Sequence, residues 1–176
     1  MKPYSEIVQN IQTLHELGET IQAAYFVLKE YGLEHPKLKG FELREKAKPE
    51  YVLMTTEGNF GESQIIKIPE NTFEFEFILM LNLLAHEMVH VIQKSSENCP
   101  RDRNEREWQA YYEMLFHKIF PSVPNAKSHQ LKFFGNKALE YYNRMEKDGE
   151  LQQKYATQKA EVEHLISKIN LIKPQN

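Results

Sequence analysis

The chain has 176 residues, of which 41% are hydrophobic and 11% aromatic; these values suit one domain with a real core and argue against an intrinsically disordered chain. The formal net charge of −3 gives no reason to expect nucleic acid or an anionic membrane as a partner. Cys99 is the only cysteine, so no internal disulfide can form, and no apolar signal core follows Met1. We therefore expect a cytoplasmic protein.

The first part of the chain predicts two helices followed by a small sheet. Apolar residues recur at helical spacing over residues 6–17 and 20–31, and a glycine follows each segment. Three short segments, 41–44, 51–56 and 63–68, are rich in strand-forming residues and separated by turns, so we expect three strands. The edge of the last strand could pair with an extended peptide, or it could be covered.

An almost unbroken apolar run over residues 73–92 predicts the central helix. Asn71 or Thr72 could cap it. The run is long enough to raise the question of a membrane span, but it carries several ionisable side chains. We therefore interpret it as a buried helix of a globular fold.

This helix contains the pattern His-Glu-x-x-His. His86 and His90 lie four residues apart, so a helix presents both imidazoles on one face. Glu87 lies about 100° further round the helix, too far to be an ideal third ligand but close enough to reach a water on a bound metal ion. The pattern is typical of zinc metallopeptidases and predicts two ligands and a general base. Gln93, on the same face, could orient a ligand or contact substrate.

A second strong helix is predicted from residue 104 to 115. Glu107, Ala110, Tyr111 and Met114 form one stripe along it. A small residue one turn from an acid allows two helices to approach closely, which a third zinc ligand from this helix requires.

Two further helices are predicted over 128–147 and 150–172. The last one could pack on the domain, extend from it, or pair with another chain. The predicted fold is therefore α+β and predominantly helical, with a small twisted antiparallel or mixed sheet before the motif helix and additional helices at the C-terminal end.

The motif followed by Glu107-x-x-Ala110-Tyr111 resembles the gluzincin class of zinc metallopeptidases over about residues 50–118. The resemblance implies a zincin-like catalytic domain over 1–125, with a helical extension over 126–176. It also implies that Glu107 is the third zinc ligand, although Glu105 and Glu113 are alternatives. Thermolysin-like members carry an acid where Tyr111 stands, so we expect the surroundings of the histidines to differ.

The resulting hypothesis is a zinc-dependent peptidase. One zinc ion is bound by His86, His90 and Glu107, and Glu87 takes a proton from an activated water and passes it to the leaving amine. Tyr111 is the predicted oxyanion donor, while Gln93 and Ile66 are predicted to contact substrate. The other candidate donors are Tyr112, His117 and His129.

Two alternatives belong to other classes of protein. One is a catalytically silent zincin fold that keeps its metal for structure, and the other is a helical module for protein interaction. The partners expected under the main hypothesis are a peptide or protein substrate, without nucleic acid or membrane. Self-association through the C-terminal helix is a further prediction.

Overall fold

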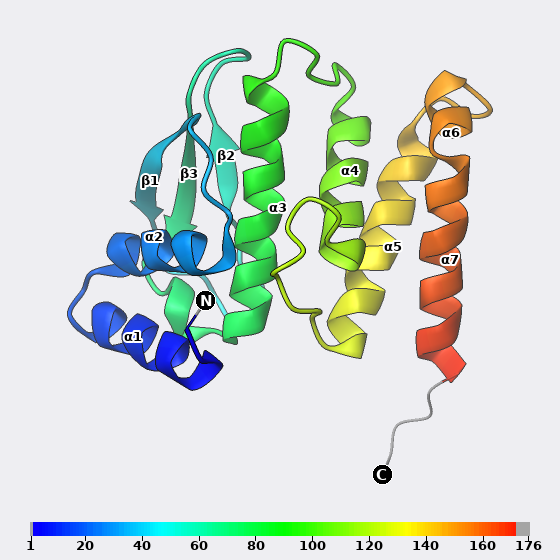
Figure 1. The fold of residues 1–176 in the computed structure, drawn as a ribbon. Coiled ribbons are helices and arrows are strands. Elements are labelled where there is room, and N and C mark those ends of the chain that lie inside the picture. Colours follow the sequence, from blue (N-terminus) through cyan, green and yellow to red (C-terminus); the bar gives the residue numbers. More distant parts are fainter. Residues whose placement is uncertain (1, 172–176) are drawn as a thin grey trace.

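The computed structural model describes residues 2–171, and most of them are helical (Figure 1). The helices are α1 (Tyr4–Glu16), α2 (Thr20–Tyr31), α3 (Phe77–Ser95), α4 (Arg103–Phe116), α5 (Ser128–Arg144), α6 (Glu150–Lys154) and α7 (Ala156–Leu171), with a 3-10 turn η1 (Thr72–Glu74). The strands are β1 (Leu38–Arg44), β2 (Thr55–Glu57) and β3 (Gln64–Pro69). The expected α+β class, predominantly helical with a small sheet before the motif helix, is confirmed.

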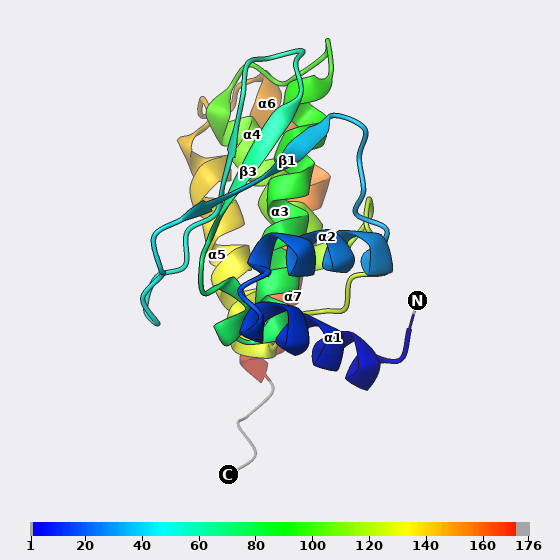
Figure 2. The ribbon, with the colours of Figure 1, turned by 90° about the vertical axis from the view of Figure 1, so that its left-hand side faces the viewer.

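The three strands form a mixed sheet in the order β1-β3-β2. β3 runs parallel to β1 and antiparallel to β2. In Figure 2, β1 and β3 lie in front of α3. Alternate residues of β3 (Gln64, Ile66 and Ile68) are fully buried, as expected where one face of a strand packs against helices.

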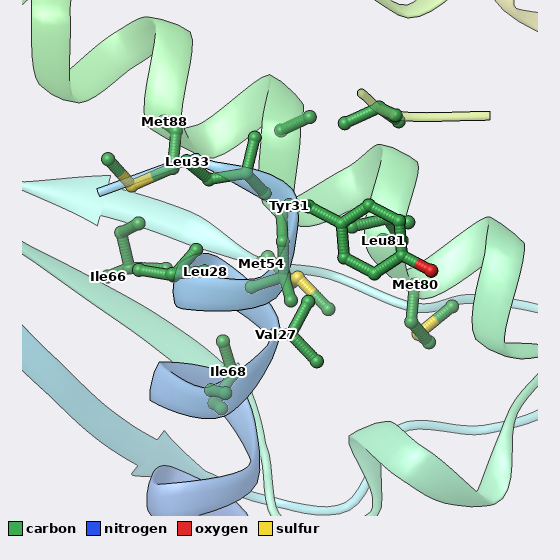
Figure 3. Packing of buried hydrophobic residues seen from close by; sticks show 14 of the residues in the cluster. Val27, Leu28, Tyr31, Leu33, Met54, Ile66, Ile68, Met80, Leu81 and Met88 are labelled. Carbon is green, nitrogen blue, oxygen red and sulfur yellow. The ribbon is translucent and has the colours of Figure 1, made fainter. Parts of the chain in front are cut away.

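Two hydrophobic clusters lie on opposite sides of the α3–α4 layer. The first joins α1, α2, the sheet and α3, and Figure 3 shows Leu28, Ile66, Leu81 and Met88 among its members. The second joins α4, α5 and α7 around the fully buried Trp108. Because α4 supplies residues to the same cluster as α5 and α7, residues 126–171 pack on the domain instead of projecting from it.

The position of β3 corrects one part of the sequence interpretation. β3 was the expected edge strand, but it lies in the centre of the sheet. Ile66 faces Phe41 of β1 and Thr56 of β2, and its side chain is fully buried. The prediction that Ile66 contacts substrate is therefore wrong, because neither its side chain nor its strand edge is open. β2 is an edge strand instead.

Two predicted helices differ from those observed. The motif helix begins at Phe77, not near residue 72, because Phe75 has an extended conformation after the η1 turn. The expected helix over 150–172 is divided into α6 and α7 at Tyr155, whose backbone leaves helical geometry. Residue 172 lies outside the described residues.

The apolar side of α7 faces α5 of the same chain. Gly135 of α5 is so close to Ile166 that a Cβ atom there would lie 2.9 Å from its side chain, and Val162 is fully buried in the same interface. This packing does not test self-association through α7, which stays a prediction. Within residues 2–171 no helix combines the length and apolar character that a bilayer span requires.

We predict that Glu113→Ala destabilises the fold. Glu113 is not one of the three candidate metal ligands, so the effect is expected on stability and not through loss of a ligand. The buried Glu113 carboxylate accepts hydrogen bonds from the backbone N–H groups of Lys118, Ile119 and Phe120, at 2.8 to 3.0 Å. Leaving these donors unpaired should lower the free energy of unfolding by about 2–3 kcal/mol in urea denaturation. The control Glu97→Ala removes an exposed carboxylate and should change it little. Equal stability of the two variants would contradict this role.

Candidate metal centre

α3 and α4 lie side by side in opposite directions, and this packing brings the predicted ligands together (Figure 1). Ala110 of α4 is fully buried, and its small side chain permits the close approach of the two helices. Glu107 lies one turn before Ala110 and reaches the paired histidines of α3. His86, His90 and Glu107 form the cluster within residues 2–171 that could hold a metal ion.

The three ligand atoms form a nearly equilateral triangle. The Nε2 atoms of His86 and His90 are 3.2 Å apart, and Oε2 of Glu107 lies 3.6 Å from the first and 3.8 Å from the second. A tetrahedral zinc ion with bonds of 2.0–2.1 Å holds neighbouring ligand atoms about 3.4 Å apart. The donor set and its spacing therefore fit a three-ligand zinc site with one open position.

The alternative third ligands lie elsewhere. Glu105 points to the other side of α4, where its carboxylate accepts hydrogen bonds from Lys154 and Tyr155 at 2.8 and 2.7 Å. Glu113 binds backbone N–H groups after α4. Of the three glutamates, the structure brings only Glu107 to the histidine pair.

Gln93 has a different role from the predicted contact with substrate. Its side-chain oxygen lies 2.9 Å from Nδ1 of His90, so an N–H on Nδ1 leaves Nε2 free for a metal ion. The amide of Gln93 donates to Gln109 at 2.8 Å and to the carbonyl of Arg106 at 3.1 Å. Gln93 is buried and is not among the residues that line the cleft, so its contacts favour the alternative that it orients His90 and give no support to a contact with substrate.

This hydrogen-bond chain continues into the C-terminal helices. Gln109 donates to the hydroxyl of Tyr155 at 2.6 Å, and that hydroxyl donates to Glu105 at 2.7 Å. Tyr155 is the residue at which the last predicted helix is divided. The break between α6 and α7 therefore coincides with a contact that supports His90 through Gln109 and Gln93.

His86 is held by aromatic packing. Its ring lies 4.6 Å from the ring of Tyr111, in an edge arrangement, and Tyr111 stacks on Tyr141 at 5.7 Å. Nδ1 of His86 is buried and has no hydrogen-bond partner among residues 2–171. The side chain that packs against the first histidine of the motif is therefore a tyrosine.

The residues of the cluster shift one another's pKa values. Burial alone would raise the pKa of Glu107, but hydrogen bonds and charge from His86 and His90 outweigh it and hold this pKa well below its usual range. Burial likewise opposes protonation of His90, yet Glu107 and Glu87 raise the pKa of its imidazole. Two imidazoles around one carboxylate thus stabilise the anion that a metal ligand requires.

Glu87 is fixed by β2. The hydroxyl of Thr56 donates to Oε2 of Glu87 at 2.8 Å and also lies 3.0 Å from its backbone carbonyl oxygen. The ammonium group of Lys94 donates to the carbonyl of Thr56. Glu87 is therefore held beside the histidine pair by the edge strand, outside the ligand triangle.

The cluster opens into a cleft of about 790 Å³. One wall is formed by residues 49–56 and the other walls by α3, α4 and α5. His86, Glu87, His90, Glu107, Tyr111 and His129 line it. Tyr112 and His117 do not, since Tyr112 turns toward Glu161 and His117 is buried at the end of α4.

Sequence reasoning missed several residues of this site. Lys94, Arg103 and Arg106 line the cleft, and the first two lie four residues from His90 and Glu107 in helices, a spacing that could have shown them. Thr56 and Tyr155 carry no comparable signal, because their contacts join distant parts of the chain.

Comparison with known proteins gives no relative. No family model, no curated protein and no solved structure matches the chain. The case for a function therefore rests on the geometry of the site.

We predict that Gln93→Met weakens metal binding. Methionine has nearly the same side-chain size as glutamine but cannot replace the oxygen that accepts from Nδ1 of His90. Loss of such a supporting hydrogen bond typically costs about 10- to 100-fold in metal affinity. Titration with Co²⁺, followed by its visible absorption, measures the change, and Gln22→Met on the exposed side of α2 is the matched control. Unchanged Co²⁺ affinity in Gln93→Met would show that this contact does not support the site.

Proposed function

We propose that the chain is a zinc-dependent peptidase of the gluzincin type, with His86, His90 and Glu107 as the zinc ligands. The observation that carries the proposal is the convergence of three ligand atoms at tetrahedral spacing, with Glu87 beside them, at the wall of an open cleft. A purely structural zinc site is normally closed by four protein ligands. Three ligands within a cleft instead favour catalysis.

The choice of zinc rests on the donor set. Two imidazoles and one carboxylate suit zinc, whereas magnesium and calcium prefer oxygen ligands throughout. A bound zinc ion supplies a Lewis acid and makes hydroxide available near neutral pH.

Glu87 has the position that a general base requires. It follows His86 in the chain and lines the cleft. Its carboxylate accepts a hydrogen bond from Thr56 and lies outside the triangle of candidate ligands. In this role it accepts a proton from the attacking water and delivers it to the leaving amine. The hydrogen bond from Thr56 limits the side chain to one orientation.

Tyr111 is the proposed donor to the developing oxyanion. It lines the cleft and packs on His86. Burial, followed by the charge of Glu107, raises the pKa of its phenol far above neutrality. The hydroxyl therefore stays protonated and able to donate a hydrogen bond. His129 also lines the cleft, on α5.

A peptide substrate fits the form of the cleft. Residues 49–56 make one wall and lead into β2, an edge strand of the sheet. Backbone groups along such a segment can hold an extended peptide by pairing with its main chain. The segment that ends in β2, and not β3, is therefore the one proposed to pair with an extended substrate.

We predict that Glu107→Ala loses zinc. Elemental analysis of protein purified without chelator should give about one zinc per chain for the unmodified protein and much less for the variant, because only two ligands remain. Glu97→Gln is the matched control, since it alters an exposed glutamate outside the triangle and outside the hydrogen-bond chain that reaches His90. Retention of a full zinc equivalent by Glu107→Ala would contradict the ligand assignment.

We also predict that Glu87→Gln keeps its zinc and loses peptidase activity. The amide preserves the size of the side chain but cannot accept the proton, so turnover of a peptide mixture should fall by at least about 100- to 10,000-fold. Zinc content is measured on the same samples. If Glu87→Gln hydrolyses peptides as fast as the unmodified protein, the assigned mechanism is wrong.

A further inference from the structure

Basic side chains gather at one end of the cleft. Lys94 lies four residues after His90 on α3, and Arg103 lies four residues before Glu107 on α4; both line the cleft. Because the two helices are antiparallel, both steps lead toward the same end (Figure 1). Residues four apart on a helix share one face and lie about 6 Å apart along its axis. The two cations therefore lie about one helical turn beyond the metal cluster.

Neither these cations nor the neighbouring Arg106 forms an ion pair within residues 2–171. Lys94 donates to the carbonyl of Thr56. Arg106 donates to the carbonyls of Pro100 and Arg101, at 2.8 and 3.0 Å, and lies 5.3 Å from the centre of the Phe60 ring. Arg103 is exposed to solvent. Three positive charges are thus left without an acidic partner in the described part of the chain.

Partial burial disfavours the charged form of Lys94. Its side chain is half-buried, and burial together with the nearby Arg106 lowers the pKa of the ammonium group, an effect that Glu87 and Glu57 offset only in part. A desolvated cation is stabilised by an anion that comes to lie beside it. The acids that line the cleft are otherwise occupied: Glu107 contacts the histidines and Glu87 is held by Thr56. Glu50 lies exposed on the opposite wall.

The other end of the cleft is apolar. Leu79 and Leu83 of α3 line it, seven and three residues before His86, together with Phe133 of α5. The side chain of Phe133 is 55% exposed although it is large and apolar. Lys137, which also lines the cleft, forms an ion pair with Glu140, with Nζ and Oε2 2.8 Å apart. The cleft is therefore apolar on one side of the metal cluster and basic on the other.

We propose that the cleft selects peptides that carry a carboxylate about two residues from the scissile bond. The proposal rests on the peptidase function proposed above. An extended chain advances about 3.3–3.6 Å per residue, so the distance of one helical turn corresponds to two residues. Lys94 and Arg103 bind the carboxylate, and an apolar residue on the other side of the scissile bond packs over Leu79, Leu83 and Phe133. The carboxylate is either an acidic side chain or the C-terminus of the peptide.

The first experiment identifies the cleavage pattern and its charge dependence. The zinc-loaded full chain is incubated with a proteome-derived peptide mixture, and the products are sequenced by mass spectrometry. Three matched peptides with the best apolar residue are then compared: one with Glu at the second position and an amidated C-terminus, one with Gln there and an amidated C-terminus, and one ending there with a free carboxylate. We expect kcat/KM for at least one carboxylate peptide to exceed that for the neutral peptide by about tenfold.

The second experiment changes the cation. Arg103→Gln should reduce the preference for the carboxylate about three- to fivefold, and Arg103→Glu should abolish it or reverse it in favour of Lys at the same position. Arg103 is exposed, so neither variant is expected to affect folding. Lys39→Gln, which removes an exposed charge from β1 away from the cleft, should leave the preference unchanged.

The outcomes separate this inference from the function on which it rests. Cleavage of carboxylate and neutral peptides at equal rates overturns the inference alone. A carboxylate preference that survives Arg103→Glu together with Lys94→Gln also overturns it. If the zinc-loaded chain cleaves none of the peptides, the proposed peptidase function fails, and the inference fails with it. Preference for Glu over a free C-terminus, or the reverse, supports it and identifies the source of the carboxylate.

Discussion

The close packing of α3 against α4 is the contact on which the candidate site depends. The helical repeat places His86 and His90 together without help from the rest of the chain. The candidate third ligand, Glu107, comes from α4, and the fully buried Ala110 lies one turn further along the same helix. The three candidate ligand atoms lie within 3.2 to 3.8 Å of one another where the helices pack. The proposed metal site therefore depends on the packing of α3 against α4.

The two hydrophobic clusters hold this pair of helices from both sides. The sheet and α2 support α3, and Thr56 of β2 donates a hydrogen bond to Glu87, the proposed base. On the other side α5 and α7 pack around Trp108 of α4. The contact from Tyr155 through Gln109 to Gln93 links the C-terminal helices with His90. The segment after residue 125 thus supports the site as well as covering α4.

Local patterns in the sequence predicted much of this arrangement. Helical spacing identified the segments of α1 to α5, and the four-residue interval identified the histidine pair. The same reasoning favoured Glu107 over Glu105, because Glu107 shares a stripe with Ala110 whereas Glu105 points away toward Tyr155. These features depend on residues close together in the chain, so the sequence expresses them directly.

Features that depend on distant contacts were missed. Strand order is set by pairing between segments far apart, so the central position of β3 and the burial of Ile66 had no local signal. The helical pattern is interrupted at Tyr155, whose hydroxyl binds Glu105 and Gln109, fifty and forty-six residues earlier in the chain. Gln93 was recognised as part of the site face, but only the structure shows that it contacts His90 and not the cleft.

The most direct test of the central claim is X-ray absorption spectroscopy at the zinc edge on the zinc-loaded chain. The account predicts four light-atom neighbours near 2.0–2.1 Å, with the multiple scattering of two imidazoles and no sulfur. A sulfur neighbour would point to Cys99, and a single imidazole would separate His86 from His90. Either result, or failure of the chain to retain zinc, would contradict a site built from His86, His90 and Glu107.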